Sequence, residues 1–377
     1  MRVVFLRSNP IKPDPRVEKE ADSLLKAGHL VMAVAWNREI NHHPRSGYIH
    51  LENGDMPIRW FNRRANFGGG MKNILPLFLF QIMIFCWLIK HFRKYDSIHA
   101  CDFDTVLPAW FVAKLFRKNI IYDVFDYYVD AFSVPEKLKS LIETVDIFIL
   151  NTVDTVIITN ESRLNQISKS KPKNLVIIHN SPKRTSSLFN NNKEIFNPKP
   201  IFTYVGILQP GRLILEIIEV FKKRKDWELH IGGFGSLEKF VREAAELYRN
   251  IHFYGRIPYD QVLQMESRSD ILFAIYDPSV PNHKYSSPNK LYEAMMLGKP
   301  LIVSKGTGID QIVDEQKIGA SINYKASEFE TAAEKLLEKK DLEEIKEKSI
   351  EIYNTKYSWE IMEERLTDLY RNLKKSS

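Results

Sequence analysis

The chain has 377 residues, of which 44% are hydrophobic and 27% charged, a composition typical of a soluble globular protein and not of a disordered chain. This length favours two domains of about 180 residues each. The formal net charge is +7, but residues 1–200 hold 28 Lys and Arg against 19 Asp and Glu, whereas residues 201–377 hold 26 against 28, so the positive excess belongs to the first half.

Both cysteines, Cys86 and Cys101, lie in apolar stretches and provide neither a disulfide framework nor the spacing of a metal site. We therefore expect both to be buried and reduced, as in a cytosolic protein. The chain begins directly with a strand-like run, without the basic segment and the long apolar segment of a secretory signal. These features predict a cytoplasmic protein.

Strand-like and helix-like segments alternate in the first half of the chain. The predicted strands cover residues 3–6, 30–36, 97–100, 120–124, 155–159 and 175–179. The predicted helices cover residues 15–26, 105–116, 135–150 and 161–169. Pro15 suits the first position of a helix. Alternation of this kind predicts a parallel sheet with right-handed crossover connections.

One segment of the first half has a distinct composition. Residues 56–95 contain no Asp or Glu but seven basic residues, namely Arg59, Arg63, Arg64, Lys72, Lys90, Arg93 and Lys94. They enclose an apolar run, residues 74–89, which is interrupted by Pro76 and Gln81. As a helix this run would be about 24 Å long, shorter than the hydrocarbon core of about 30 Å, which disfavours a transmembrane span.

Two other interpretations of residues 74–89 remain. One is an ordinary helix, buried between the sheet and its neighbouring helices. The other is a helix whose outer face, rich in Phe and Trp, rests in the headgroup layer of an anionic membrane. The candidate membrane contacts are then Arg59, Arg63, Arg64, Arg93 and Lys94.

Residues 181–200 are rich in Pro, Ser, Asn and Lys and show no periodicity, which predicts a linker between domains. The N-terminal domain would then comprise residues 1–180, and the C-terminal domain residues 201–357. A last helix, residues 358–377, begins with Ser358 as its N-cap and is assigned to the N-terminal domain.

The second half continues the α/β alternation, with glycines at the strand ends. The predicted strands cover residues 201–205, 227–232, 271–275 and 301–303, and the predicted helices residues 236–249 and 258–267. The glycines are Gly206, Gly232, Gly233, Gly235 and Gly255. A strand, a glycine loop and a helix start bring backbone N–H groups close to a phosphate. The alternative is that these glycines only allow positive φ angles in turns.

The most informative stretch is residues 286–304, S-S-P-N-K-L-Y-E-A-M-M-L-G-K-P-L-I-V-S. Pro288 suits the first turn of a helix and Gly298 its end. Lys290 and Glu293 are three residues apart and share the front of this helix. A cation, a carboxylate and a helix N-terminus suit a ligand with phosphates and hydroxyls. The alternative is a surface ion pair on an ordinary helix.

The pattern P-x-K-x-x-E-A-M-x-x-G-K-P in this stretch resembles the donor-site motif of retaining glycosyltransferases of family 4, which have the GT-B fold. The resemblance implies that Glu293 binds the ribose of a nucleotide-sugar donor. Many members carry a second glutamate eight residues earlier, where this chain has Tyr285. The implied fold has two Rossmann-like domains facing across a cleft, with a C-terminal helix that crosses back to the first domain.

The same resemblance supplies further site residues. In the family, an arginine and a lysine after the first strand of the donor domain neutralise the departing diphosphate. Ile207 replaces that arginine, so Arg212 and Lys290 become the candidate cations and, with Glu293, the candidate catalytic residues. The candidate donor contacts are Gly206, Gly232, Gly233, Gly235, Arg256, Ser287, Pro288, Asn289 and Glu293.

Two stretches of the first half also resemble the family. P-D-P-R-V-E-K-E-A at residues 13–21 resembles the first loop and helix, which makes Arg16 a candidate contact for the acceptor or a donor phosphate; the alternative is an ion pair with Glu20. Y-D-V-F-D at residues 122–126 resembles a strand end where a histidine approaches the donor sugar. Phe125 replaces that histidine, and Asp126 is either an acceptor-side residue or an ordinary loop carboxylate.

The D-x-D pattern of Asp102 and Asp104 holds a metal in other glycosyltransferases. GT-B enzymes generally need no such metal and no third ligand lies nearby in sequence, so we expect a metal-independent reaction without a cofactor. Asp104 is then expected to cap the helix that follows.

The resemblance implies transfer of a sugar from a nucleotide-diphosphate donor to a hydroxyl, with retention of anomeric configuration. The expected acceptor is lipid-linked or a saccharide, at the anionic inner face of the plasma membrane, and we expect no nucleic-acid partner. Two alternatives stay open: a nucleotide-sugar 2-epimerase of the same fold, and a non-catalytic homologue, since Phe125 and Tyr285 replace two usually functional residues.

Overall fold

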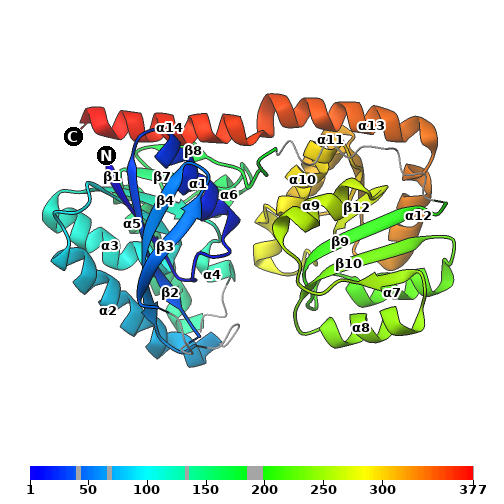
Figure 1. The fold of residues 1–377 in the computed structure, drawn as a ribbon, viewed down its shortest axis with the longest axis horizontal. Coiled ribbons are helices and arrows are strands. Elements are labelled where there is room, and N and C mark those ends of the chain that lie inside the picture. Colours follow the sequence, from blue (N-terminus) through cyan, green and yellow to red (C-terminus); the bar gives the residue numbers. More distant parts are fainter. Residues whose placement is uncertain (40–43, 66–69, 132–135, 185–197, 377) are drawn as a thin grey trace. The chain divides into compact units, whose positions relative to one another are not determined.

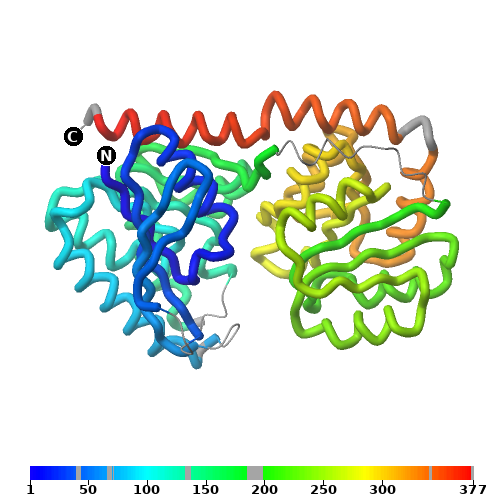
Figure 2. Tube along the Cα trace, in the orientation of Figure 1, coloured from blue at the N-terminus to red at the C-terminus, as the bar shows by residue number. Residues whose placement is uncertain are grey.

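The computed structural model describes residues 1–39, 44–65, 70–131, 136–184 and 198–376 (Figure 1). The chain forms two compact units, one made of Met1–His179 with Met362–Ser377 and the other of Asn180–Ile361. The return of the C-terminal residues to the first unit can be followed in the tube trace (Figure 2). Most of the predicted linker, residues 185–197, lies outside the described residues.

The first unit contains an eight-stranded sheet in the order β3-β4-β2-β1-β5-β6-β7-β8. All neighbouring strands are parallel except the pair β3 and β4. The strands are β1 (Arg2–Arg7), β2 (Leu30–Asn37), β3 (Ser46–Leu51), β4 (Gly54–Asn62), β5 (Ser97–Cys101), β6 (Asn119–Val124), β7 (Thr155–Ile158) and β8 (Leu175–Ile177). Helices cover both faces of this sheet, which is why its central strands are continuous apolar runs.

The sequence prediction missed the antiparallel hairpin of β3 and β4. These strands are joined by the two residues Glu52 and Asn53, and Leu51 pairs with Gly54. Asn53 and Gly54, of which the first lies in the turn and the second pairs with Leu51, are typical turn residues that could have marked this hairpin. Because β4 then pairs in parallel with β2, the hairpin extends the sheet at one edge.

Seven α-helices of the described residues belong wholly or mainly to the first unit: α1 (Pro15–Lys26), α2 (Ile74–Lys90), α3 (Phe103–Phe116), α4 (Tyr128–Ala131), α5 (Glu136–Thr152), α6 (Arg163–Gln166) and α14 (Trp359–Ser376). Helices α2, α3 and α5 share one core cluster with the sheet. On the other face Tyr370 of α14 places its Oη 2.9 Å from His99 Nδ1 of β5. Alternate residues of β5 thus face opposite layers: Ile98 and Ala100 face the hydrophobic core, and His99 faces the polar layer under α14.

Helix α2 is only partly buried, so the interpretation of an ordinary buried helix is incomplete. Phe80, Ile84 and Leu88 form its buried stripe, whereas several apolar residues on its other side are exposed. Cys86 is among the exposed residues, so the prediction that both cysteines are buried is wrong for Cys86 and right for Cys101. Among the described residues, no helix is long and apolar enough to cross a membrane.

The second unit contains a six-stranded, fully parallel sheet in the order β11-β10-β9-β12-β13-β14. Its strands are β9 (Ile201–Ile207), β10 (Glu228–Phe234), β11 (Ile251–Phe253), β12 (Ile271–Ala274), β13 (Leu301–Ser304) and β14 (Gly319–Ile322). The two edge strands, β11 and β14, were not predicted because they are short and only partly buried.

Two separate hydrophobic cores lie on the two faces of this sheet. One includes residues of α7 (Ile214–Lys223), α8 (Glu238–Leu247) and α12 (Ala326–Leu336). The other includes residues of α9 (Tyr259–Ser267), α10 (Asn289–Leu297) and α11 (Ile309–Gln316), and α13 (Lys339–Ile352) contacts α10. Helix α10 begins after Pro288 and ends at Gly298, which has φ 64°, as the sequence predicted.

A buried carboxyl group in the first unit gives a pH-dependent stability. Asp146 of α5 is 1% exposed and accepts a hydrogen bond of 3.0 Å from Tyr122 Oη. Burial raises the pKa of Asp146 to about 7. Because the folded pKa lies above the unfolded value, this group favours folding at low pH, and that contribution is lost as the pH rises through about 7.

We expect Asp146→Asn to remove this pH dependence, since an amide mimics the protonated carboxyl group. The free energy of unfolding in urea should match that of the unchanged protein at about pH 3 and exceed it by about 4 kcal/mol at pH 8. The exposed Asp260 provides the control, Asp260→Asn, which should show no such difference. Equal stability of Asp146→Asn and the unchanged chain at both pH values would contradict the shifted pKa.

Candidate active site

The candidate site lies at the carboxyl ends of the parallel strands in the second unit. The loop after β9 carries Arg212, β10 ends in a glycine-rich segment, and the loop after β12 leads into α10 with Lys290 and Glu293. Because all pairings are parallel, these segments meet at one edge of the sheet, where ligands of open α/β sheets usually bind.

Two glycines allow the strand ends to approach each other closely. A Cβ on Gly233 would lie 1.8 Å from the carbonyl oxygen of Gly206, and one on Gly235 would lie 2.2 Å from that of Leu208. Both glycines also have positive φ angles, 132° and 151°. Any other residue would push the ends of β9 and β10 apart.

The expected glycine loop needs a correction. Gly232 and Gly233 lie within β10, and the N–H of Gly233 donates to the carbonyl of Gly255 at 2.7 Å. This N–H is therefore occupied by the fold, and the expectation that it faces a phosphate is wrong. Their role as residues that line a donor stays a prediction. Arg256, the next candidate, is exposed and stacks on the ring of Phe234 at 4.7 Å.

Arg212 is held in place by its loop and by an aromatic ring. Its guanidinium carbon lies 4.1 Å from the ring centroid of Tyr276. The flanking backbone is fixed, since Gly211 accepts from the N–H of Asp277 and Leu213 donates to Tyr324 Oη, both at 3.0 Å. Arg212 Nε is buried and has no hydrogen-bond partner among the described residues. A buried, unpaired guanidinium N–H is suited to an anion.

Lys290 is buried beside Arg212, with 8% of its surface exposed. Its Nζ lies 4.7 Å from the ring centroid of Tyr204, and a Cβ on Gly206 would be 3.5 Å from it. Burial lowers the pKa of Lys290, the nearby carboxyl groups of Glu266 and Glu293 oppose this, and Arg212 adds to the lowering. The alternative of a surface ion pair on α10 is therefore wrong.

Glu293 occupies the next turn of α10 and is 3% exposed. It accepts a hydrogen bond of 2.8 Å from Tyr259 Oη, which belongs to α9. The other candidates around it come from the start of α10: Ser287 is buried with its Oγ 3.0 Å from Tyr292 Oη, and Pro288 and Asn289 begin the helix. The structure thus brings Gly206, Arg212, Lys290 and Glu293 together.

The sequence prediction missed Glu266, which completes this cluster. Glu266 of α9 is fully buried, and burial followed by the neighbouring Glu293 carboxylate raises its pKa well above the usual range. The raised pKa favours the neutral form of Glu266, while Glu293 accepts the hydrogen bond from Tyr259. Nothing in the sequence indicates that Glu266 is buried, because the surrounding residues 265–270, M-E-S-R-S-D, are typical of the charged end of an exposed helix.

In the first unit, Arg16 is buried in a network of ion pairs rather than exposed to a ligand. It donates to Asp123 through Nε and Nη2 at 3.1 and 2.8 Å and to the carbonyl of Ile178 at 2.8 Å. Its Nε also lies 3.2 Å from Glu20 Oε1, the pair that the alternative interpretation predicted. The structure favours a structural role for Arg16 over an acceptor contact.

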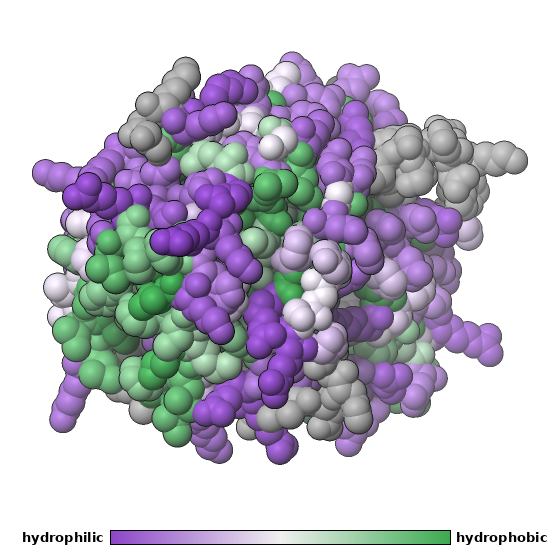
Figure 3. Space-filling view, turned by 60° about the vertical axis from the view of Figure 1, so that its left-hand side comes forward, coloured by the Kyte–Doolittle hydropathy of each residue, from purple (hydrophilic) through white to green (hydrophobic). Residues whose placement is uncertain are grey.

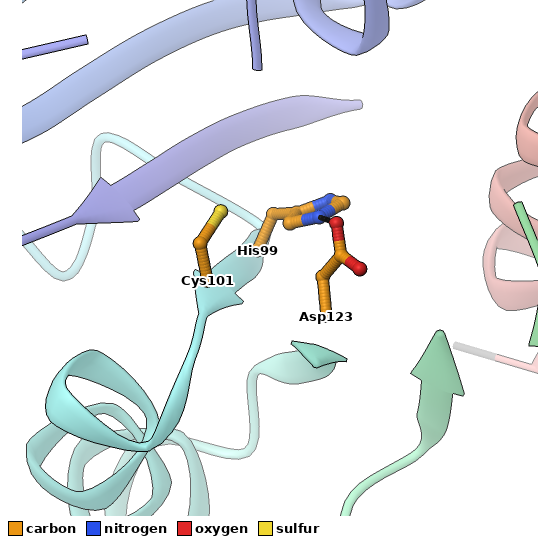
Figure 4. A group of neighbouring side chains, drawn as sticks. All are labelled: His99, Cys101 and Asp123. Carbon is orange, nitrogen blue, oxygen red and sulfur yellow. Dashed lines mark hydrogen bonds and ion pairs between the residues drawn. The ribbon is translucent and has the colours of Figure 1, made fainter. Parts of the chain in front are cut away.

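His99, Cys101 and Asp123 belong to the same network (Figure 4). Their ligand atoms lie within 4.8 Å of one another, a spacing that suits a metal, and His99 Nε2 lies 3.4 Å from Asp123 Oδ2. The Arg16 guanidinium already pairs with both oxygens of Asp123, and burial raises the pKa of the Cys101 thiol. A cation would have to displace this arginine, so the group is better explained as a polar core.

The D-x-D carboxylates also serve the fold. Helix α3 begins at Phe103, so the N-cap position is Asp102 and the prediction that Asp104 caps the helix is wrong. Asp102 Oδ1 accepts from the backbone N–H groups of Phe125 and Asp126 at 2.9 and 3.2 Å, and Oδ2 accepts from Arg7. Burial raises the pKa of Asp102 to about 6, against the opposing effect of Arg7.

The remaining first-unit candidates differ in exposure. Phe125 lies between two guanidinium groups, with Arg7 at 4.1 Å and Arg16 at 4.9 Å from its ring centroid. Asp126 is 48% exposed and accepts a hydrogen bond of 3.0 Å from Arg163. Among the candidate membrane contacts, Arg63, Arg64, Arg93 and Lys94 are exposed and Arg59 is half-buried.

Comparison with known proteins finds one matching family and several similar folds. Residues 187–353 match the family described as "Glycosyl transferases group 1". No curated protein sequence matches the chain. Three solved structures are similar over nearly the whole chain: a sucrose-phosphate synthase from Thermosynechococcus elongatus, the Anabaena protein HepE in complex with UDP, and a glycosyltransferase from Rickettsia africae.

The sucrose-phosphate synthase has a TM-score of 0.76 at 18% identity and covers 100% of both chains. HepE has a TM-score of 0.72 at 12% identity and covers 99% of this chain and 100% of its own. The Rickettsia protein has a TM-score of 0.68 at 13% identity, covering 100% of this chain and 99% of its own. At these identities the likeness shows the fold, and the predicted fold class of two Rossmann-like domains of the GT-B type is confirmed.

Proposed function

We propose that this protein is a retaining glycosyltransferase of family 4 that transfers a sugar from a nucleotide-diphosphate donor to a hydroxyl group. The observation that carries the proposal is the cluster of Arg212, Lys290 and Glu293 at the carboxyl edge of a sheet whose domain matches the glycosyl transferases group 1. The second unit would hold the donor, and the first unit the acceptor-side residues, of which Asp126 is the exposed carboxylate.

The charge of the cluster suits a departing diphosphate. Two basic residues, Arg212 and Lys290, lie beside the carboxyl groups of Glu266 and Glu293, and the raised pKa of Glu266 favours its neutral form. The N-terminus of α10 adds its helix dipole. Negative charge grows on the diphosphate as the glycosidic bond breaks, so groups fixed in advance at this position lower the barrier. Glu293 would bind the hydroxyl groups of the nucleotide ribose.

Other features refine the proposal. HepE is crystallised with UDP and with UDP-glucose, which makes uridine donors the first to test. We propose a reaction without metal or cofactor, because Asp102 and Asp104 are engaged within the first unit. The 2-epimerase and the non-catalytic homologue remain the alternatives, the latter because Phe125, packed between two arginines, supplies no acid or base.

The outer surface of the first unit supports a proposal for where in the cell the protein works. Large apolar side chains are exposed on α2, α3 and α5, and we call this surface the apolar face (Figure 3). It consists of Ile74, Leu75, Phe78, Ile82, Phe111, Leu115, Leu138, Leu141 and Phe148. Helix α3 contacts both neighbours, and Trp110 of α3 packs on Phe148 of α5 at 5.3 Å, so the three helices form one layer.

The charges near the apolar face favour an anionic membrane as its partner. Helices α2 and α3 have one acidic residue, Asp104, which is buried. The exposed charges of these two helices and the residues beside them are basic, namely Lys72, Lys90, Arg93, Lys94, Lys114 and Arg117. On α5, Lys137 is exposed and the half-buried Glu143 pairs with Lys169. Such a surface binds through apolar insertion and through attraction to anionic lipid. We therefore propose peripheral binding at the cytoplasmic face of the membrane, with a lipid-linked acceptor in cell-envelope glycan or glycolipid synthesis; a saccharide acceptor is the alternative.

Glu293→Gln should weaken binding of the nucleoside diphosphate by about 10- to 100-fold, since a charge-assisted hydrogen bond contributes about 1.5–3 kcal/mol. Titration calorimetry with UDP, GDP and ADP measures this. Glu246→Gln, at an exposed glutamate of α8, is the matched control and should bind like the unchanged chain. Unchanged affinity of Glu293→Gln would make Glu293 a structural residue and remove the central assignment.

Arg212→Ala should lower kcat for sugar transfer more than it lowers donor affinity, because the diphosphate charge increases toward the transition state. Steady-state kinetics and calorimetry together separate the two effects. Arg268→Ala, which removes an exposed arginine at the end of α9, is the control. A loss of affinity with kcat untouched would refute the role assigned to Arg212.

The protein should sediment with anionic vesicles, and less with neutral ones or at raised salt, because the attraction is screened beyond about 10 Å at 0.1 M. Changing Arg63, Arg64, Arg93 and Lys94 to Gln should reduce binding, as should Phe78→Gln with Ile82→Gln. Leu247→Gln, at an exposed leucine of the second unit, serves as the control. If all variants sediment alike, or none does with any lipid, the membrane proposal fails and a soluble acceptor takes its place.

A further inference from the structure

Two histidines and a glutamate of the second unit converge on the edge of its sheet, away from the candidate active site. Strands β10 and β11 are parallel neighbours, and their register pairs His230 with His252. Glu228 lies two residues before His230 and so projects from the same face of the sheet. The Nε2 atoms of His230 and His252 lie 3.6 and 3.7 Å from Glu228 Oε2, and all three ligand atoms lie within 4.8 Å of one another.

The fold leaves the two histidine ring nitrogens of this group without hydrogen-bond partners in the described parts of the chain. The Nε2 atoms of both histidines are buried and have no hydrogen-bond partner among the described residues. Contacts of 3.6 and 3.7 Å to the glutamate are too long for hydrogen bonds. Two ring nitrogens and a carboxylate oxygen thus lie close together without hydrogen bonds among them, and leaving the buried ring nitrogens unpaired is costly.

A tyrosine fixes the orientation of one histidine. Tyr254 Oη lies 3.0 Å from His230 Nδ1. If Nδ1 carries the proton and donates it to Tyr254, the lone pair of Nε2 points toward Glu228 and His252. A hydrogen bond from the second ring nitrogen is the usual support of a histidine that ligates a metal.

We propose that Glu228, His230 and His252 form a site for a zinc-like divalent cation that ties the edge strand β11 to β10. Two imidazoles and one carboxylate are a common ligand set for zinc, with the fourth position left to water. Bonds of about 2.0–2.1 Å in a tetrahedron place ligand atoms about 3.3–3.4 Å apart, so small side-chain movements suffice. A cavity of about 400 Å³, lined by His230, Tyr254, Gln261 and Gln264 among others, adjoins the site and provides access for water.

The role of this cation is structural and separate from sugar transfer. Glu228 is the first residue of β10, whereas the candidate active site lies beyond Gly233 at the other end of the strand. Strand β11 has only three residues and one neighbour in the sheet, so its own pairing is limited. A cation that binds the folded unit alone raises its stability by mass action.

The test is zinc binding by the full chain after treatment with a chelator. Titration calorimetry with Zn²⁺ should give one site, and Zn²⁺ should raise the unfolding temperature. His252→Gln and Glu228→Gln should each weaken this binding by about 100-fold and abolish the temperature rise. Tyr254→Phe, which keeps all three ligands, should weaken binding by about 10-fold. Co²⁺ in place of Zn²⁺ should give the visible absorption of a tetrahedral site.

Two control variants address other sites. His50→Gln removes an exposed histidine of the first unit, and Cys101→Ser removes a member of the buried group shown in Figure 4. Both should bind Zn²⁺ like the unchanged chain. The proposal is overturned if the unchanged chain binds no Zn²⁺, if His252→Gln binds it equally well, or if Cys101→Ser alone loses it.

Discussion

The structure of the candidate site depends on the burial of Lys290 next to Arg212. Two basic groups held close together repel each other, and the carboxyl groups of Glu266 and Glu293 beside Lys290 oppose the lowering of its pKa by burial and by Arg212. Burying charge without full pairing costs several kcal/mol. The aromatic rings of Tyr204 and Tyr276 offset part of this cost by facing the cations. Such an arrangement is explained if an anionic ligand completes it.

The two units use the same edge of a parallel sheet in opposite ways. In the first unit, the charges at the strand ends satisfy one another: Arg7 pairs with Asp14 and Asp102, and Arg16 with Asp123. In the second unit, Arg212 Nε has no partner among the described residues. The charged groups at the first edge therefore pair with one another. At the second edge, the guanidinium of Arg212 still has an N–H that can bind an anion. This contrast explains why a donor is assigned to the second unit.

Local patterns predicted most of the fold, because strand and helix periodicities and helix-end signals act over a few residues. They placed α10 between Pro288 and Gly298 and the central strands of both sheets. Local patterns could not predict which residues distant in the sequence would contact each other. Arg16 and Asp123 are 107 residues apart, and Glu266 meets Glu293 only through the packing of α9 on α10. The facing pair of His230 and His252 likewise depends on the register of β11, a strand too short to predict.

The most direct test of the account is the release of nucleoside diphosphate from nucleotide sugars. The unchanged chain and Lys290→Met would be incubated with UDP-, GDP- and ADP-sugars, with and without lipid-linked and saccharide acceptors, and the free diphosphate measured. We expect release from one class of donor, faster with a suitable acceptor and lost in Lys290→Met. Binding of a nucleotide sugar without any release, with every acceptor, would contradict it and identify the protein as a non-catalytic homologue.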